Sequence, residues 1–150
     1  MVTGRYCRQQ VRVLLVALLA CAASFSIAAE TFYADDIKSA TKRYISQRAD
    51  EDGLFRIHDP VADATLTLKF IKIHDPVRVI DGERYFACTD FAVVGTPEKL
   101  YDLDFWLRPS DGRLEVYEER IHKEPRRAAV WGWYKHPRYT FVNDKVVPID

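Results

Sequence analysis

The sequence has few cysteines and none of the short motifs that mark the common catalytic and cofactor sites. It contains no HExxH or CxxC metal motif, no phosphate-binding loop, no dinucleotide fingerprint and no nucleophile elbow. Its three cysteines, Cys7, Cys21 and Cys88, cannot form a network of disulfides. We therefore expect no cofactor and a fold held together by its hydrophobic core, with Cys88 as a small buried side chain.

An excess of charge of either sign is also missing, because 22 Lys and Arg residues are balanced by 22 Asp and Glu residues. Binding to nucleic acid usually leaves a strongly basic composition, so this balance argues against nucleic acid as the partner. The chain is 48% hydrophobic and 29% charged, which is typical of a globular domain and not of a disordered chain.

The N-terminus has the layout of a secretory signal peptide. The uncharged, mostly apolar residues 13–29 are followed at once by Glu30. The preceding residues are basic through Arg5, Arg8 and Arg12. We predict a signal peptide over residues 1–29 and a single domain over residues 30–150. Because cleavage removes these three arginines, the remaining domain is mildly acidic.

Cleavage after Ala28 or Ala29 would release a periplasmic or secreted protein. The apolar run is short for a membrane span, so a retained anchor is the less favoured alternative. The word Leu18-Leu19-Ala20-Cys21 also resembles a lipoprotein box, in which Cys21 would be lipidated. Contact with a membrane is expected only through the signal peptide or through lipidation of Cys21.

Hydrophobic periodicity predicts one helix followed by strands. Residues 33–49 place apolar side chains at helical spacing, with Asp35 and Asp36 in the first turn, where acidic residues favour a helix. Later segments alternate apolar and polar residues and are separated by turn signals such as Asp81-Gly82 and Asn143-Asp144.

The clearest hairpin spans Leu100–His122, with the turn Pro109-Ser110-Asp111-Gly112 in its middle. Its first arm places four apolar side chains on one face: Tyr101, Leu103, Phe105 and Leu107. We predict an α+β fold in which one amphipathic helix packs on an antiparallel meander sheet of about four to six strands.

The order of these elements resembles cystatin-like, NTF2-like and PepSY-like folds. The words YDLDFWL, IHK and PRYTF, at residues 101–107, 121–123 and 137–141, resemble a group of small uncharacterised exported bacterial proteins. The chain departs from that group by a longer insertion at about residues 124–137. The resemblance implies a fold and an exported address, and it supplies no activity.

Histidines and aspartates provide the first candidate site. A zinc or copper ion would need three or four of these side chains to converge. The candidate ligands are His58, His74, His122, Asp102 and Asp104. The alternative is that these histidines lie in solvated turns and at a strand end. If these side chains do hold an ion, the protein is a periplasmic metal-binding protein.

Asp102 and Asp104 also form a candidate catalytic pair, because they share one strand face about 7 Å apart. Such a pair can divide acid and base work, as in glycosidases, if burial separates the two pKa values. A separate hypothesis, an isomerase or hydrolase in an NTF2-like cavity, would need a deep pocket that contains a carboxylate with a raised pKa. The alternative is that Asp102 and Asp104 line a solvated face and pair with Lys or Arg residues on the neighbouring strand, such as Arg113 or Arg120.

Aromatic and basic residues near the C-terminus provide the third candidate site. Their flat rings can bury area against a partner. The residues are Trp106, Trp131, Trp133, Tyr134 and Arg138. The alternative is that Trp131 and Trp133 belong to an extra strand and cover the sheet edge or core. Because no catalytic motif is present, the leading hypothesis is a non-catalytic binding module for a protein, peptide or envelope component.

Overall fold

The computed structural model describes residues 31–149. The signal peptide predicted over residues 1–29 and the lipidation candidate Cys21 lie outside the described residues. Within residues 31–149, no helix is long and apolar enough to cross a membrane. The elements are α1 (Ala34–Arg48), β1 (Phe55–Asp59), β2 (Ala64–Ile73), β3 (Arg78–Ile80), β4 (Arg84–Val93), β5 (Thr96–Ser110), β6 (Arg113–Ala128), β7 (Gly132–Pro137), β8 (Tyr139–Val142) and β9 (Lys145–Pro148).

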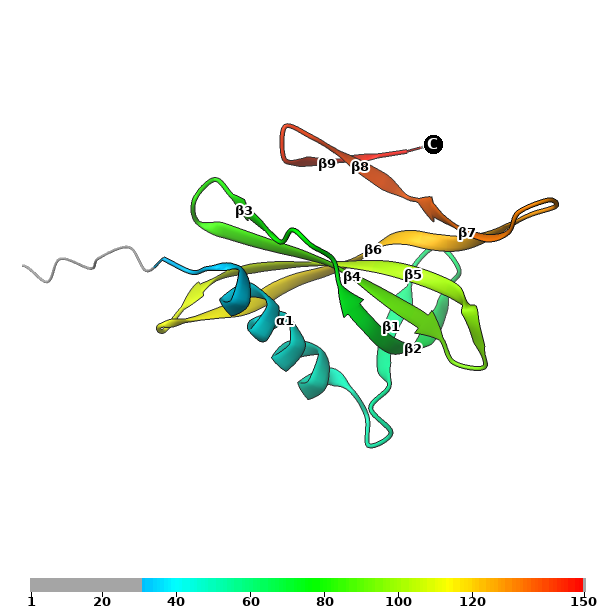
Figure 1. Ribbon diagram of the computed structural model, residues 1–150, viewed down its shortest axis with the longest axis horizontal. Coiled ribbons are helices and arrows are strands. Elements are labelled where there is room, and N and C mark those ends of the chain that lie inside the picture. Colours follow the sequence, from blue (N-terminus) through cyan, green and yellow to red (C-terminus); the bar gives the residue numbers. More distant parts are fainter. Residues whose placement is uncertain (1–30, 150) are drawn as a thin grey trace, which may run out of the picture.

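An antiparallel sheet forms the middle layer, with α1 on one face and the β8–β9 hairpin on the other (Figure 1). The sheet has the order β1-β2-β4-β5-β6-β7, and β3 pairs separately with β4. The predicted α+β architecture with a helix on an antiparallel sheet is confirmed. The expected four to six strands are too few: the main sheet has seven, and β8 and β9 form a second sheet. The count was low because much of residues 124–137, taken for an inserted loop, extends β6 and forms β7.

Helix α1 begins where the sequence predicts. The Asp36 carboxylate accepts a hydrogen bond of 2.8 Å from the Tyr33 N–H, which occupies one of the free donors at the helix start. The side chains that face the sheet are buried: Ile37, Ala40, Thr41 and Ile45. This apolar stripe anchors the helix, because a helix of 15 residues gains little stability in isolation.

The main core lies between α1 and the sheet. Leu103, Phe105 and Leu107 of β5 are completely buried there, as the alternation of the Leu100–His122 hairpin predicts. The rings of Phe55 and Phe91 pack beside them, with their centroids 5.3 Å apart. The apolar row of the hairpin is therefore the base on which the helix rests.

A second, smaller core lies on the opposite face of the sheet. Phe86 and Trp106 are cross-strand partners on β4 and β5, and both are at most 6% exposed. Phe141 of β8 covers them, with its ring centroid 5.3 Å from that of Phe86 and 6.4 Å from that of Trp106. The β8–β9 hairpin thus encloses a face that an antiparallel sheet often leaves to solvent.

Candidate metal site

Three aspartates occupy neighbouring positions beneath this hairpin. Asp90 of β4 lies directly opposite Asp102 of β5, and Asp104 follows two residues further along β5. Asp102 and Asp104 are completely buried, and Asp90 is 6% exposed. Like charges that face each other across a sheet are destabilising, so this group needs positive charge nearby.

Lysines supply that charge for Asp90 and Asp102. Lys135 of β7 donates hydrogen bonds of 2.7 Å to Asp90 Oδ1 and 2.6 Å to Asp102 Oδ1. Lys123 Nζ lies 3.0 Å from Asp102 Oδ2, and His74 Nε2 lies 2.8 Å from Asp90 Oδ1. Burial alone would raise the pKa of Asp90, but the hydrogen bonds, first of all that from Lys135, lower this pKa overall.

Arg113 and Arg120, the arginines expected to pair with Asp102 and Asp104, have other partners. Arg113 pairs with Glu115 at 3.0 Å, and Arg120 pairs with Glu118. Lys123 and Lys135 take their place because β6 continues past His122 and brings β7 alongside. The expected pairing with a basic residue of the neighbouring strand is thus confirmed for Asp102, through Lys123, but the two arginines named for it were wrong.

Asp104 differs from the other two aspartates because it has no lysine or arginine partner among residues 31–149. The Tyr139 hydroxyl donates a hydrogen bond of 2.7 Å to Asp104 Oδ2, and His122 Nδ1 lies 3.2 Å from the same oxygen. Asp104 Oδ1 and His122 Nδ1 have no hydrogen-bond partner in the part of the chain that the structure describes. Leaving a buried carboxylate without a cation costs several kcal/mol.

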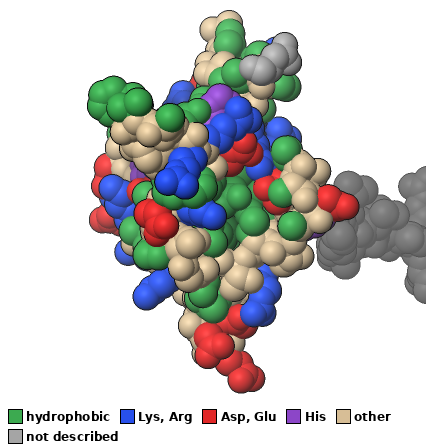
Figure 2. Space-filling view, turned by 90° about the vertical axis from the view of Figure 1, so that its right-hand side faces the viewer, with side chains coloured by type: hydrophobic (Ala, Val, Ile, Leu, Met, Phe, Trp, Pro, Cys, Tyr) green, Lys and Arg blue, Asp and Glu red, His purple; other side chains and the backbone are tan. Residues whose placement is uncertain are grey.

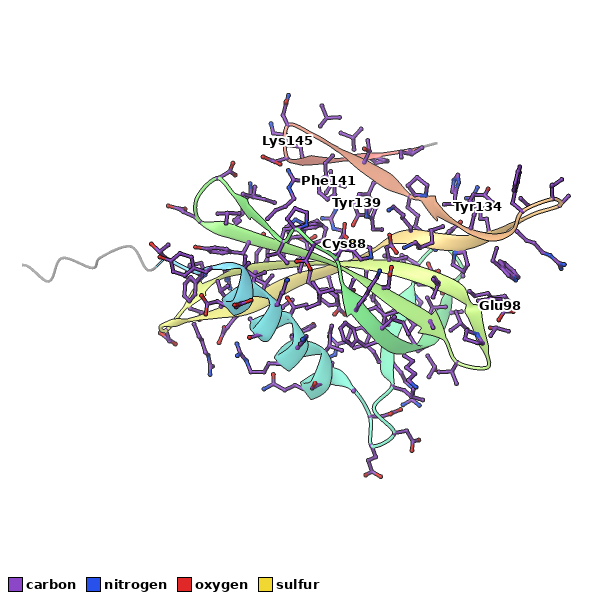
Figure 3. The ribbon with its side chains drawn as sticks, in the orientation of Figure 1. Cys88, Glu98, Tyr134, Tyr139, Phe141 and Lys145 are labelled. Carbon is purple, nitrogen blue, oxygen red and sulfur yellow. The ribbon has the colours of Figure 1, made fainter. Side chains whose placement is uncertain are left out.

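Cys88 and His122 reach Asp104 from the two neighbouring strands. Cys88 is the cross-strand partner of Asp104 on β4. The register of β6 shifts where Lys123 and Ile121 pair with consecutive residues of β5, so that His122 is the extra residue of a β-bulge. Potential ligand atoms of Cys88, Asp104 and His122 all lie within 4.8 Å of one another. Cys88 lies on the sheet, below Tyr139 and Phe141 of β8 (Figure 3).

The Cys88 thiol and the Tyr139 hydroxyl beside Asp104 keep their protons at neutral pH. Burial, followed by the negative charge of Asp104, raises the pKa of the Cys88 thiol. The same two causes raise the pKa of Tyr139, whose hydroxyl therefore remains a donor. Among Cys88, Tyr139 and His122, which contact Asp104, the first two are therefore neutral, and His122 is charged only when protonated.

A second set of ligand atoms comes from His74, Cys88 and Asp102. It shares Cys88 with the first set, but its other two members already have close partners. His74 contacts Asp90, and Asp102 is held by Lys123 and Lys135. The first set is therefore the more available of the two.

The structure brings together four of the five predicted metal ligands. His74, His122, Asp102 and Asp104 all lie at this cluster, whereas His58 does not. The exposed His58 side chain lies on β1, 3.8 Å from Asp63. Cys88 was missed as a candidate ligand because a single cysteine in a strand is usually a small buried side chain. In the structure this side chain is only half-buried.

The predicted binding residues are divided between the interior and the surface. Trp106 is 5% exposed in the second core, so it cannot contact a partner in this structure. Trp131 is 85% exposed and Tyr134 is 44% exposed, so Trp131 does not cover the core. The extra strand of the alternative is present as β7, which contains Trp133 and pairs with β6. Trp133 is half-buried, with Lys99 Nζ 4.6 Å from its ring centroid.

Arg138 holds the edges of the main sheet together and does not lie on a free surface. Its guanidinium donates two hydrogen bonds of 2.7 Å to the buried carboxylate of Asp59, at the end of β1. It donates a third, also of 2.7 Å, to Glu124 of β6. Burial alone would raise the pKa of Asp59, but the Arg138 and backbone hydrogen bonds lower it overall.

Comparisons with family models, curated proteins and solved structures give no match to this chain. The resemblance to small exported bacterial proteins stays a prediction.

Proposed function

We propose that this protein is an exported, non-catalytic binding domain whose ligand is a divalent transition-metal ion, with Cys88, Asp104 and His122 as its protein ligands. The exported address rests on the signal-peptide pattern of residues 1–29. We also propose a cystatin-like fold, which the arrangement of one helix on an antiparallel sheet supports. The resemblance to small exported proteins is further support for the exported address.

The observation that carries the proposal is the buried Asp104 carboxylate, whose Oδ1 has no partner within residues 31–149. A bound cation would supply the positive charge that lysines supply to Asp90 and Asp102. It would also use the orphaned His122 Nδ1. Binding of the cation would thereby remove the cost of several kcal/mol that a buried carboxylate without a counter-charge imposes on the folded state.

The donor set indicates which ion would bind. A thiolate, an imidazole and a carboxylate form a mixed S, N and O set that suits Zn²⁺ better than Mg²⁺ or Ca²⁺, which prefer oxygen ligands only. The ligand atoms of Cys88, Asp104 and His122 are within 4.8 Å of one another, so small side-chain movements would bring them to bonding distance. Three protein ligands leave a fourth position for water.

Binding of the ion must release the proton of Cys88, because the thiolate is the ligand. The raised pKa of this thiol means that the proton is present at neutral pH. We therefore expect the apparent affinity for Zn²⁺ to rise with pH. Calorimetric titration in two buffers of different ionisation enthalpy should detect the release of about one proton for each ion bound.

The enzyme alternative has less support from the geometry. A cavity of about 600 Å³ opens between β1 and β6, and its lining includes Arg48, Arg120, Arg138 and Glu119. None of the three buried aspartates of the cluster lines this cavity. An isomerase or hydrolase based on Asp102 and Asp104 would need substrate to reach a layer that β8 and β9 cover.

Titration of the metal-free protein with Zn²⁺ tests the proposal. The wild-type protein should bind one ion, and Cys88→Ser and His122→Ala should abolish binding. His58→Ala is the matched control, because His58 is exposed and belongs to neither set of potential ligand atoms. At a free Zn²⁺ concentration about 100 times the Kd, binding should raise the Tm by roughly 10 °C. No stoichiometric binding, or equal binding by Cys88→Ser, would contradict the proposal.

A further inference from the structure

The turn between β6 and β7 exposes apolar side chains that the metal site does not explain. This β6–β7 tip consists of residues 128–132, with the sequence AAVWG, and it contains no polar side chain. Val130 is 80% exposed and Trp131 is 85% exposed. Gly132 closes the turn with a φ of +75°, which glycine adopts without strain. The tip projects at one end of the molecule (Figure 1).

Aromatic and basic side chains follow the apolar tip along the hairpin. Trp133 pairs across the strands with Arg127, and Tyr134 pairs with Arg126. Arg126 and Arg127 are both exposed. Arg126 pairs with Glu124 at 2.7 Å, whereas Arg127 has no ion pair among the described residues, and Lys99 lies over the Trp133 ring. Figure 2, turned so that this end faces the viewer, shows hydrophobic side chains at the surface with Lys and Arg side chains beside them and Asp and Glu side chains among these.

This order matches the layers of an anionic bilayer surface. Apolar side chains favour the hydrocarbon edge, Trp and Tyr favour the interface, and Arg and Lys favour anionic headgroups. Tyr134 lies three residues beyond Trp131, which corresponds to about 10 Å along a strand. That span is comparable with the depth of about 5–10 Å to which interfacial segments enter a bilayer.

We propose that the β6–β7 tip inserts into the headgroup layer of an anionic membrane, with Val130 and Trp131 at the apolar boundary and Arg126 and Arg127 against the lipid phosphates. A protein partner fits less well, because a stable protein interface needs about 800 Å² on each side and the tip offers two large side chains on a narrow turn. A bilayer deforms around such a projection. This contact lies outside the metal cluster, so neither proposal depends on the other.

Vesicle binding by the mature protein tests this contact. The probes are vesicles of phosphatidylcholine alone and vesicles with equal parts of phosphatidylcholine and phosphatidylglycerol. We expect co-sedimentation with the anionic vesicles, weakened by salt, and a fall in affinity of about tenfold or more for Trp131→Ser. The double variant Arg126→Gln/Arg127→Gln should lose its preference for the anionic vesicles. Val61→Ser, at another exposed turn, is the matched control.

Thermal unfolding of each variant separates a loss of binding from a loss of fold, and all are expected to keep the wild-type Tm. Quenching of Trp fluorescence by lipids with brominated acyl chains should report insertion in the wild type and should be lost in Trp131→Ser. Absence of vesicle binding, or equal binding by wild type and Trp131→Ser, would overturn the proposal. A tip variant that loses a protein partner, in a protein that binds no vesicles, would assign the tip to protein recognition and would also overturn it.

Discussion

Arg138 joins the two edges of the main sheet, and its replacement by Met is expected to destabilise the fold by about 3–5 kcal/mol. The guanidinium makes two hydrogen bonds of 2.7 Å to Asp59, whose side chain is completely buried. Without Arg138, Asp59 keeps only backbone partners, the N–H groups of Val61 at 2.9 Å and Ala62 at 3.4 Å. The loss is large because the mutation leaves a buried charge uncompensated.

For a domain of about 120 residues this loss corresponds to a fall in Tm of roughly 10–20 °C. Urea denaturation followed by circular dichroism should give the free energy of unfolding of Arg138→Met, Asp59→Asn and the double variant. We expect the double variant to lose less than the sum of the two single variants, because neither charge is then left alone. Asp63→Asn is the control, since that side chain is 96% exposed. A loss below about 1 kcal/mol for Arg138→Met, or strictly additive losses, would refute this account.

The pair should also produce a dependence of stability on pH. The pKa of Asp59 is lowered in the folded protein, since the hydrogen bonds outweigh the opposing effect of burial. The stabilisation is therefore present above the unfolded-state pKa of about 4, and it is lost as pH falls through the lower folded-state pKa. In Asp59→Asn this part of the acid dependence should be absent. An identical acid slope in the variant and the wild type would contradict the assignment.

Three further outcomes are expected. Trp106→Ala should cost about 3–5 kcal/mol in urea denaturation, because it empties the second core, and a loss below about 1 kcal/mol would show that the β8–β9 hairpin does not pack there. Trp131→Ala should change the free energy of unfolding by less than about 0.5 kcal/mol, whereas a large loss would place this side chain in the core. In the metal-free protein, iodoacetamide should alkylate Cys88 more slowly than in urea, because burial raises the pKa of the thiol, and equal rates would contradict its described environment.

Local sequence patterns predicted the helix, most of the strands, and which side chains of the sheet are buried against the helix. The alternation of Leu103, Phe105 and Leu107 depends only on neighbours in the chain, and these side chains are buried as expected. In residues 64–73 the alternation of apolar and polar side chains changes phase after Phe70, which is typical of a β-bulge, and the register of β2 shifts between Phe70 and Lys72. Such features need no knowledge of which strands pair.

The opposite face could not be predicted in this way, because it depends on where the last hairpin packs. The turn at Asn143-Asp144 and the flanking strands were predicted, and β8 and β9 confirm them. Nothing local indicates that Phe141 covers Trp106. Trp106 was therefore assigned to a binding surface, although it belongs to a core.

The candidate metal site depends on register as well. Cys88 and Asp104 meet only because β4 and β5 pair in one particular alignment, and His122 joins them through a bulge in β6. The sequence offered one signal, since the alternation YFACTDF places Cys88 and Asp90 on the same face of a strand. That signal identifies a face and not a partner strand.

The absorption spectrum of the Co²⁺ form tests the proposed metal site most directly, because a thiolate ligand produces an intense ligand-to-metal band that oxygen ligands lack. The account predicts this band, with one ion bound, in the wild-type protein and in His58→Ala. The band should be absent in Cys88→Ser. A spectrum equal to that of Co²⁺ in water, or an unchanged band in Cys88→Ser, would contradict the claim that Cys88, Asp104 and His122 hold a metal ion.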